Sequence, residues 1–239
     1  MPPKIIWLLW LQGWEAAPDL VRSCGASWLR HNRNWTINFL TLDKIKELGL
    51  GPELSPFLNK PMPPEALSDL IRLQLLATHG GVWADATVYC LRPLDQWLSD
   101  VAASGFFAFS RPGPDRMLST WFLAADAQSC VIQRWRERAH AYWMGRDDRD
   151  DYFWVHRLFE QTYNSNEAFR EVWDNVPKLS ADGPHCFQPP EQLLDSMTDF
   201  HRRVVEAAET PMLKLSHKLN HNSVAENSVY RWLCRRLEQ

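Results

Sequence analysis

Residues 66–90 have the sequence ALSDLIRLQLLATHGGVWADATVYC, and this stretch decides the fold that we predict for the chain. The spacing predicts a helix over residues 65–79, because prolines precede it at 63 and 64 and two glycines follow it. Apolar residues cover most sides of that helix, so we expect it to be buried. After the glycines, residues 82–84 predict a short apolar strand that ends at an acidic residue, Asp85.

Two charged residues interrupt the apolar surface of the predicted helix. Asp69 and Arg72 are three residues apart and therefore share one helix face. One interpretation is an ion pair within the helix. The other is that both side chains face a polar ligand, because a charge in an apolar helix needs a partner. The pattern by itself leaves both interpretations open.

Asp85 stands where the ligand of an open α/β sheet is expected, since such ligands bind outside the carboxyl ends of the strands. A carboxylate at this point can hold a divalent cation, Mn²⁺ or Mg²⁺, and the cation can bind a substrate phosphate. Thr87 lies on the same side of an extended chain and could supply a second oxygen ligand. The alternative is that Asp85 is a turn residue between two strands.

The rest of the chain continues the alternation of strands and helices. Apolar runs and helical spacing predict strands over 4–11, 35–42, 106–110, 119–125 and 210–215, and helices over 18–32, 44–48, 129–144 and 223–237. Residues 51–64 contain five prolines and predict an irregular segment. This order predicts an α/β fold, a single domain over residues 1–239 with a mostly parallel central sheet flanked by helices.

Composition excludes some classes of function. With 239 residues and a net charge of −3, the chain offers no electrostatic argument for a nucleic-acid partner. Its five cysteines are scattered and form no CxxC pair, which indicates reduced thiols in a cytoplasmic protein. The apolar run over residues 5–11 is too short to span a bilayer, so any membrane association, at the inner face, would be peripheral. Most of the 13 tryptophans are expected in the core.

The helical Asp69 and Arg72, the glycine pair and Asp85 together resemble the donor site of glycosyltransferase family 32 and the related capsular polysaccharide synthesis proteins. The pattern of that group is a helix with Asp and Arg three apart, then Gly-Gly-aromatic-x-Asp-x-Asp. Trp83 stands at the aromatic position and Asp85 at the first aspartate. The sequence departs from the pattern at the third motif position, where Thr87 replaces the second aspartate.

The resemblance implies a GT-A-type nucleotide-diphospho-sugar transferase. Such an enzyme moves a sugar from a nucleotide-diphosphate donor to a glycan or lipid-linked acceptor with retention of configuration, here in the synthesis of capsular or other surface polysaccharide. Asp85 would be the catalytic and metal-binding carboxylate, with Thr87 as a second metal ligand. Asp69, Arg72 and Trp83 would bind the donor.

The resemblance also implies roles for residues outside the central stretch. It suggests Trp10 beneath the nucleotide base, Asp43 near the ribose or base, Asp151 at the acceptor cleft, His217 as a late metal ligand and Lys218 beside the diphosphate. Four of these residues have a structural alternative. Trp10 would be a core residue, Asp43 and Asp151 would be helix N-caps, and His217 would be a structural histidine.

Two other classes of function stay open at this point. A non-catalytic sugar-binding or scaffolding relative would account for Thr87 and for the many tryptophans. A phosphotransferase of the haloacid dehalogenase type would use Asp85 as a nucleophile at the end of an apolar strand. The helical Asp69 and Arg72 argue against the second class.

Overall fold

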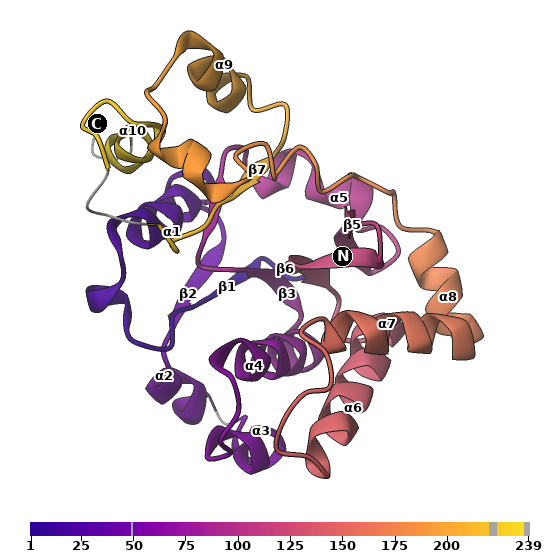
Figure 1. Cartoon of the computed structure of the whole chain (residues 1–239). Helices are drawn as coiled ribbons and strands as arrows, with labels where there is room; N and C mark the ends of the chain where they lie inside the picture. The colour runs from indigo at the N-terminus through magenta and orange to yellow at the C-terminus, as the bar shows by residue number, and fades with distance from the viewer. Residues whose placement is uncertain (49, 220–223, 237–239) are drawn as a thin grey trace.

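The computed structural model describes residues 1–48, 50–219 and 224–236, and it is a mixed α/β fold around a five-stranded sheet (Figure 1). Within the described residues, the strands are β1 (Ile5–Leu9), β2 (Thr36–Leu40), β3 (Gly81–Ala84), β4 (Val88–Cys90), β5 (Phe106–Gly113), β6 (Arg116–Ala125) and β7 (Met212–Lys214). The α-helices are α1 (Asp19–His31), α2 (Leu42–Glu47), α3 (Gly51–Leu58), α4 (Pro64–His79), α5 (Leu98–Val101), α6 (Cys130–Met144), α7 (Trp154–Ser165), α8 (Glu167–Asp174), α9 (Asp199–Ala207) and α10 (Val229–Arg235). Three short 3₁₀ helices are η1 (Trp14–Ala16), η2 (Leu94–Gln96) and η3 (Pro190–Leu194).

The five-stranded sheet has the order β2-β1-β3-β6-β5. β1 is parallel to both β2 and β3, whereas β6 is antiparallel to its neighbours β3 and β5. Four strands therefore share one direction and β6 alone in this sheet runs against them, which confirms the predicted mostly parallel sheet. The carboxyl ends of β1, β2 and β3 meet at one edge, where the loops of such sheets bind ligands.

The glycine pair between α4 and β3 is required by close approach of the backbone. Gly80 ends the helix with a φ of +68°, and Gly81 begins the strand with a φ of +96°. A Cβ on Gly81 would lie 2.5 Å from the carbonyl oxygen of Ile5 in the neighbouring strand. Only glycine meets both conditions, so these two residues let the helix turn directly into the sheet.

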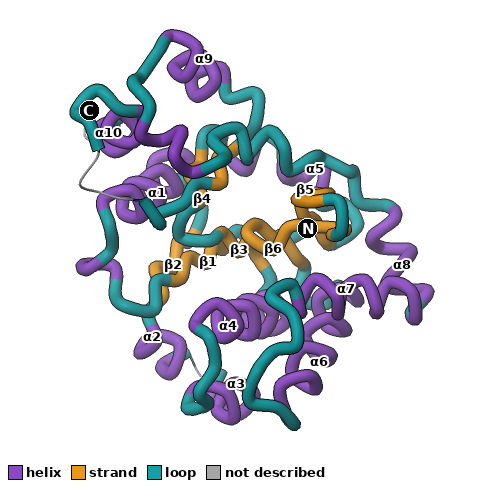
Figure 2. The backbone as a smooth tube through the Cα atoms, in the orientation of Figure 1, coloured by secondary structure: helices purple, strands orange, loops and turns teal. Residues whose placement is uncertain are grey.

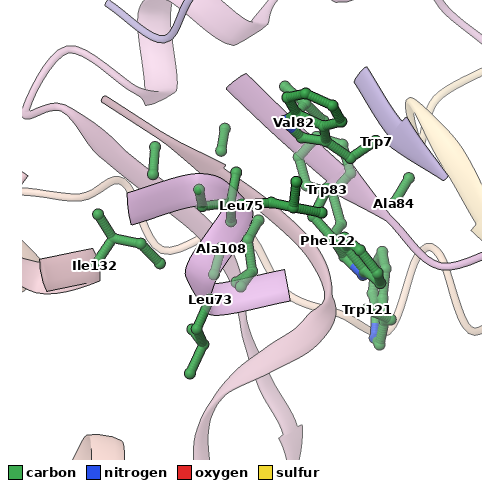
Figure 3. Packing of buried hydrophobic residues seen from close by; sticks show 14 of the residues in the cluster. Trp7, Leu73, Leu75, Val82, Trp83, Ala84, Ala108, Trp121, Phe122 and Ile132 are labelled. Carbon is green, nitrogen blue, oxygen red and sulfur yellow. The ribbon is translucent and has the colours of Figure 1, made fainter. Parts of the chain in front are cut away.

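Helices cover both faces of the sheet. Figures 1 and 2 show α4 and α6 on one side and α1 with α10 on the other. The main core lies between the sheet and its helices, and Figure 3 shows apolar side chains of β1, β3, β5 and β6 gathered there with those of α4 and α6. A second core joins α1 and α10 to the antiparallel pair β4–β7 and includes Leu20, Tyr89, Leu213 and Leu233.

Several predicted boundaries are wrong, each for a local reason. Residues 51–58 form helix α3 instead of an irregular segment. Pro52 lies in the first turn, where a missing amide costs no hydrogen bond, and the short helix also tolerates Pro56 in its interior. The side chain of Thr41, not Asp43, caps α2 by accepting from the Lys44 amide. Phe153 is the N-cap of α7, while the carboxylate of Asp151 accepts from the Phe153 amide one turn earlier.

The last predicted helix and the possibility of a membrane-spanning helix can also be compared with the structure. The predicted closing helix over residues 223–237 begins and ends at residues outside the described part, within which α10 covers Val229–Arg235. Among the described helices, none combines the length and the apolar character needed to cross a bilayer. The single-domain organisation over residues 1–239 stays a prediction.

Candidate functional site

Asp85 is the centre of the candidate site, directly after β3 at the carboxyl edge of the sheet. Its Oδ1 accepts hydrogen bonds of 2.9 Å from the Arg72 guanidinium and from the indole nitrogen of Trp83. Its Oδ2 accepts one of 3.1 Å from the ammonium of Lys214. Both carboxylate oxygens are therefore held by positively polarised donors, which fixes the direction of the side chain.

The charged residues of α4 belong to the same cluster. Arg72 pairs with Asp69 on its own helix through one nitrogen and with Asp85 through the other. The structure thus contains the ion pair of the first interpretation and extends it to Asp85. The side chain of Arg72 is only 5% exposed, so it lies beneath Asp85 and orients that carboxylate. Whether Asp69 and Arg72 contact a donor stays a prediction.

Burial and charge act on the two carboxylates in different proportions. Burial raises the pKa of Asp69 to about 6, an effect that Arg72 opposes and Asp85 reinforces. Burial also favours the neutral form of Asp85, but Lys214, Arg72 and the Trp83 hydrogen bond outweigh it and lower the pKa of that carboxyl. Asp85 is therefore ionised at neutral pH.

Trp83 supports Asp85 from within the core. Its side chain is buried at the end of β3, and the guanidinium of Arg72 lies 4.9 Å from the centre of its ring. Such a cation–π contact stabilises a buried guanidinium that has few water molecules around it. The contact between Trp83 and the donor stays a prediction.

Lys214 is a site residue that the sequence argument missed. It ends β7, and its ammonium donates a 2.7 Å hydrogen bond to the hydroxyl of Thr87 in addition to the bond to Asp85. The sequence argument named the neighbouring His217 and Lys218 instead. The available signal was a lysine that closes the apolar run of Met212 and Leu213, at the end of a predicted strand.

Trp10 follows β1 at the same edge of the sheet as Asp85. It packs against the small cluster of Ala17, Val21 and Ala86, and the ring of His217 meets its indole edge-on at a centroid distance of 5.1 Å. The indole nitrogen of Trp10 is buried and has no hydrogen-bond partner among the described residues. The structure thus brings Trp10 and His217 together, while their roles toward a ligand stay predictions.

Asp43 and Lys218 are more exposed to solvent than Asp85 and its partners. The side chain of Asp43 is 88% exposed on α2 and approaches Lys46 at 3.9 Å. Lys218 is exposed in the segment after β7. Neither is part of the hydrogen-bond network around Asp85 within the described residues, so their predicted contacts with the donor would have to form when it binds.

Asp151 belongs to a different network. Its carboxylate pairs with Arg157 on α7, and the same guanidinium binds Asp115 at 2.9 Å at the tip of the β5–β6 hairpin. Asp115 lines a cavity of about 750 Å³ between this hairpin and helices α7 and α8. Arg116 lines the cavity as well and stacks on Phe153 at 4.0 Å. The hairpin turn lies at the carboxyl end of β5, and therefore at the same edge of the sheet as Asp85.

His156 connects these two parts of the edge. Burial, together with the nearby Arg116 and Arg72, lowers the pKa of His156 to about 3, so the imidazole is neutral. Its Nδ1 is buried without a hydrogen-bond partner among the described residues. The indole nitrogen of Trp121 in β6 is also buried without a hydrogen-bond partner among the described residues. The backbone carbonyl of Trp121 accepts a hydrogen bond from the Asp85 amide.

The residues around Asp85 do not fit a divalent cation as they are arranged. A cation between Asp85 and Thr87 would have to displace the ammonium of Lys214, which already binds both side chains. In the described part of the chain, no group of three or more His, Cys, Asp or Glu residues is placed to hold a metal. The predicted site of Asp85, Thr87 and His217 stays a prediction that requires Lys214 to move.

Comparison with known proteins identifies the family. The capsular polysaccharide synthesis proteins match the chain over residues 1–233, and the chain belongs to this family. It is 27% identical over 165 residues to the O-glycosyltransferase braB of Annulohypoxylon truncatum, a match that covers 59% of this chain and 38% of the relative. It is 30% identical over 166 residues to the glycosyltransferase afumC of Aspergillus fumigatus, covering 59% and 40%.

A solved structure supports the fold. The PaToxG glycosyltransferase superposes with a TM-score of 0.50 at 12% sequence identity, over 88% of each chain. At this identity the likeness concerns the fold alone. The chain matches only about two fifths of the length of its curated relatives.

Proposed function

We propose that this protein transfers a sugar from a nucleotide-diphosphate sugar to a hydroxyl group of a glycan or lipid-linked acceptor. The observation that carries the proposal is the ionised Asp85, held by Arg72, Trp83 and Lys214 at the carboxyl edge of the sheet. The glycosyltransferase names of its relatives support the same reaction class. Capsular or other surface polysaccharide synthesis is the proposed setting, because the family is named for it.

The proposed step is a displacement at the anomeric carbon. The acceptor oxygen forms a bond to this carbon, while the bond from the carbon to the diphosphate oxygen breaks and its electron pair stays on the diphosphate. The acceptor proton passes to a phosphate oxygen on the same face, which gives retention without a covalent intermediate. Charge therefore develops on the diphosphate, and fixed positive groups near Asp85 would stabilise it.

Each predicted donor-binding residue has a proposed part in this step. Trp10 would stack on the base beside the carboxyl end of β1, and Asp43 would approach the ribose. Asp69, Arg72 and Trp83 would hold Asp85 in place. Lys218 would approach the diphosphate from the segment after β7. The Mn²⁺ or Mg²⁺ expected from the sequence would bind at Asp85 only if Lys214 moved away.

The acceptor is proposed to enter beside the β5–β6 hairpin. The cavity there is lined by polar side chains that can bind hydroxyl groups, including Ser110, Asp115 and Asp182. Arg157 pairs both with Asp151 and with Asp115, which lines this cavity. This shared partner supports the predicted place of Asp151 at the acceptor cleft. A cavity that presents a few polar side chains among apolar ones can bind a sugar.

The alternatives differ in what they predict. A non-catalytic sugar-binding relative would bind ligand without turning over any donor. The haloacid dehalogenase-type phosphatase receives no support, because the family match is to capsular polysaccharide synthesis proteins. It would release phosphate from simple phosphate esters.

The first experiment measures the melting temperature of the purified protein with UDP, GDP, ADP, CDP and dTDP and with their sugars. A ligand that binds the folded state raises this temperature by mass action, so one nucleotide class should stand out. The matching sugar donor should then be hydrolysed slowly, with release of the nucleotide. Binding without any hydrolysis or transfer would favour the non-catalytic relative, and no binding by any nucleotide would overturn the proposal.

A further inference from the structure

We propose that Lys214 is the cation that binds the donor diphosphate, so that the protein needs no divalent metal for donor binding. The inference rests on the proposed function and names the group that supplies the positive charge. It starts from the position of Lys214, whose ammonium lies 2.7 Å from Thr87 Oγ1 and 3.1 Å from Asp85 Oδ2. These two side chains hold the first and third positions of the Asp-x-Thr motif, where the family pattern has its two aspartates.

The replacement of the second aspartate by Thr87 suits an ammonium better than a metal ion. A threonine hydroxyl is neutral, so it accepts a hydrogen bond from Lys214 without neutralising its charge. Divalent magnesium and manganese prefer carboxylate ligands, and Asp85 is the one carboxylate in contact with Lys214 in the described structure. A lysine at position 214 therefore accounts for a threonine, instead of a second aspartate, at position 87.

The charges in the cluster are balanced before any ligand binds. Asp69 and Asp85 are the two carboxylates, and Arg72 and Lys214 are the two cations that contact them. A divalent cation added here would face no uncompensated carboxylate. A diphosphate, in contrast, would meet the ammonium of Lys214 directly.

Lys214 also has the capacity to bind a phosphate oxygen. An ammonium has three N–H donors, and two of them are directed at Asp85 and Thr87. Among the described residues the third has no hydrogen-bond partner, so it remains for a ligand. The side chain of Lys214 is 20% exposed, whereas that of Arg72 is 5% exposed, so Lys214 is the cation of the cluster that a ligand can reach.

The backbone holds Lys214 at this place. Lys214 is paired with Val88 in the β4–β7 ladder, and the next amide, that of Leu215, donates a 3.0 Å hydrogen bond to the carbonyl of Thr87. The two strands thus clamp the lysine beside the motif. A cation fixed before the reaction stabilises developing charge without the cost of reorganisation.

During transfer, the ammonium would donate a hydrogen bond to the diphosphate oxygen that keeps the electron pair of the broken bond. In this step Lys214 acts as an electrostatic group and not as an acid. Asp85 and Thr87 position it, which gives the motif a role that does not depend on a bound ion.

The test compares nucleotide binding with and without metal. The wild-type protein is dialysed against EDTA, and the dissociation constants of the five nucleoside diphosphates are measured by calorimetry in EDTA and in Mn²⁺. We expect the constant of the preferred nucleotide to agree within about twofold between the two conditions, since a hydrogen-bonded ammonium supplies the charge. Loss of binding in EDTA with recovery in Mn²⁺ would overturn this inference and leave the proposed function intact. Absence of binding by all five nucleotides in both conditions would overturn the proposed function and this inference with it.

The variant Lys214→Met keeps the length of the side chain and removes the charge. We expect it to bind the preferred nucleotide about 10- to 100-fold more weakly, the usual loss for a charged hydrogen bond. Lys4→Met is the matched control, because Lys4 also pairs with an aspartate, Asp95 at 2.9 Å, but precedes β1 at the opposite end of the strand. Equal binding by wild type and Lys214→Met would contradict the inference.

A double variant tests the exchange of lysine for metal directly. Thr87→Asp combined with Lys214→Ala restores two aspartates and removes the ammonium. We expect this protein to bind the nucleotide only with Mn²⁺, and to lose binding in EDTA. Metal-independent binding by the double variant would show that Lys214 is not the cation that matters. Far-UV circular dichroism of each variant establishes that the fold is retained.

Discussion

Two clusters of the same three residue types lie at opposite ends of the sheet. Asp85 accepts hydrogen bonds from Trp83 and Lys214 at the carboxyl ends of the strands. Asp95 accepts hydrogen bonds of 2.9 Å from Trp35 and Lys4, which precede β2 and β1 at their amino ends. Asp, Trp and Lys in contact are therefore not enough to define a functional site.

The difference between the clusters lies in what is beneath them. Asp85 has Arg72 and Asp69 behind it in the core, and its side chain is 26% exposed, against 40% for Asp95. The hydrogen bond from Lys4 lowers the pKa of Asp95 against the opposing effect of burial, and the hydrogen bond from Trp35 adds to the lowering. At Asp85, strong burial is outweighed by two cations. A buried charge network at the carboxyl edge of the sheet therefore distinguishes the candidate site from a surface ion pair.

Removing the buried cation should have the largest effect. Arg72→Met leaves Asp69 and Asp85 without their shared partner, and breaking a buried ion pair costs about 3–5 kcal/mol of unfolding free energy. Lys4→Met breaks the exposed pair with Asp95 and should cost less than about 1 kcal/mol. Urea denaturation at pH 7 measures both. Equal losses in the two variants would remove the distinction between the clusters.

The two aspartates should differ in activity. Asp85→Asn keeps the shape of the side chain but removes the charge that orients Lys214, and we expect donor turnover to fall about 10²- to 10³-fold, as for the loss of one preorganised electrostatic group. Asp95→Asn should leave turnover within about twofold of wild type, because Asp95 lies at the amino ends of the strands. Initial rates of nucleotide release check both. Unchanged turnover in Asp85→Asn would refute the assignment of the site.

The dependence of stability on pH should have opposite signs for Asp69 and Asp95. The pKa of Asp69 is raised to about 6 from an ordinary value of 3.8, so its ionisation costs stability as pH rises through that interval. Relative to wild type, Asp69→Asn should therefore gain on the order of 2 kcal/mol between pH 4.5 and pH 7.

Asp95→Asn is the control for this measurement. The pKa of Asp95 is lowered, so its contribution to stability is present above pH 3.8 and is lost as pH falls through the lowered pKa. Its difference from wild type should stay constant from pH 4.5 to pH 7. Urea denaturation across this range gives both curves, and a flat difference for Asp69→Asn would mean that Arg72 fully compensates its charge.

The tryptophans give the smallest expected effect. Trp10→Leu removes the ring proposed to stack on the base, and nucleotide affinity should fall about tenfold, near the lower end of measured stacking contributions. Trp35→Leu removes the tryptophan bound to Asp95 and should not change nucleotide affinity. Calorimetric titration with the preferred nucleoside diphosphate separates the two. A loss in Trp35→Leu equal to that in Trp10→Leu would indicate a general effect on folding.

The central motif was predictable because its information is local. Asp69 and Arg72 meet across one helical turn, and the glycine pair limits the conformations open to the chain between α4 and β3. The apolar run of β1 likewise predicted a buried parallel strand, which the pairing with β2 and β3 confirms. Thr41 was missed as the cap of α2 because Thr41 and Asp43 are both capping residues two positions apart, and only the position of the first turn decides between them.

The rest of the site depends on contacts between distant segments. The resemblance predicted Asp151 at the acceptor cleft from a local motif. Its partner Arg157 also binds Asp115, which is 42 residues from Arg157 in the sequence, and no local pattern predicts that contact. His156 lies near Arg72 only because α7 packs beside the sheet edge. Such contacts follow from the packing of helices on the sheet, which single-sequence periodicity does not specify.

The sequence by itself determined the α/β fold, the helix with Asp69 and Arg72, and the placement of Asp85 at the end of a strand, because each depends on neighbours within a few residues. Only the tertiary structure decided that Lys214 binds Asp85 and Thr87. Thr87 and Lys214 are 127 residues apart, and the register of β4 against β7 brings them together. A shift of one residue in that register would turn Lys214 to the other face of the strand, and the site would lose its cation.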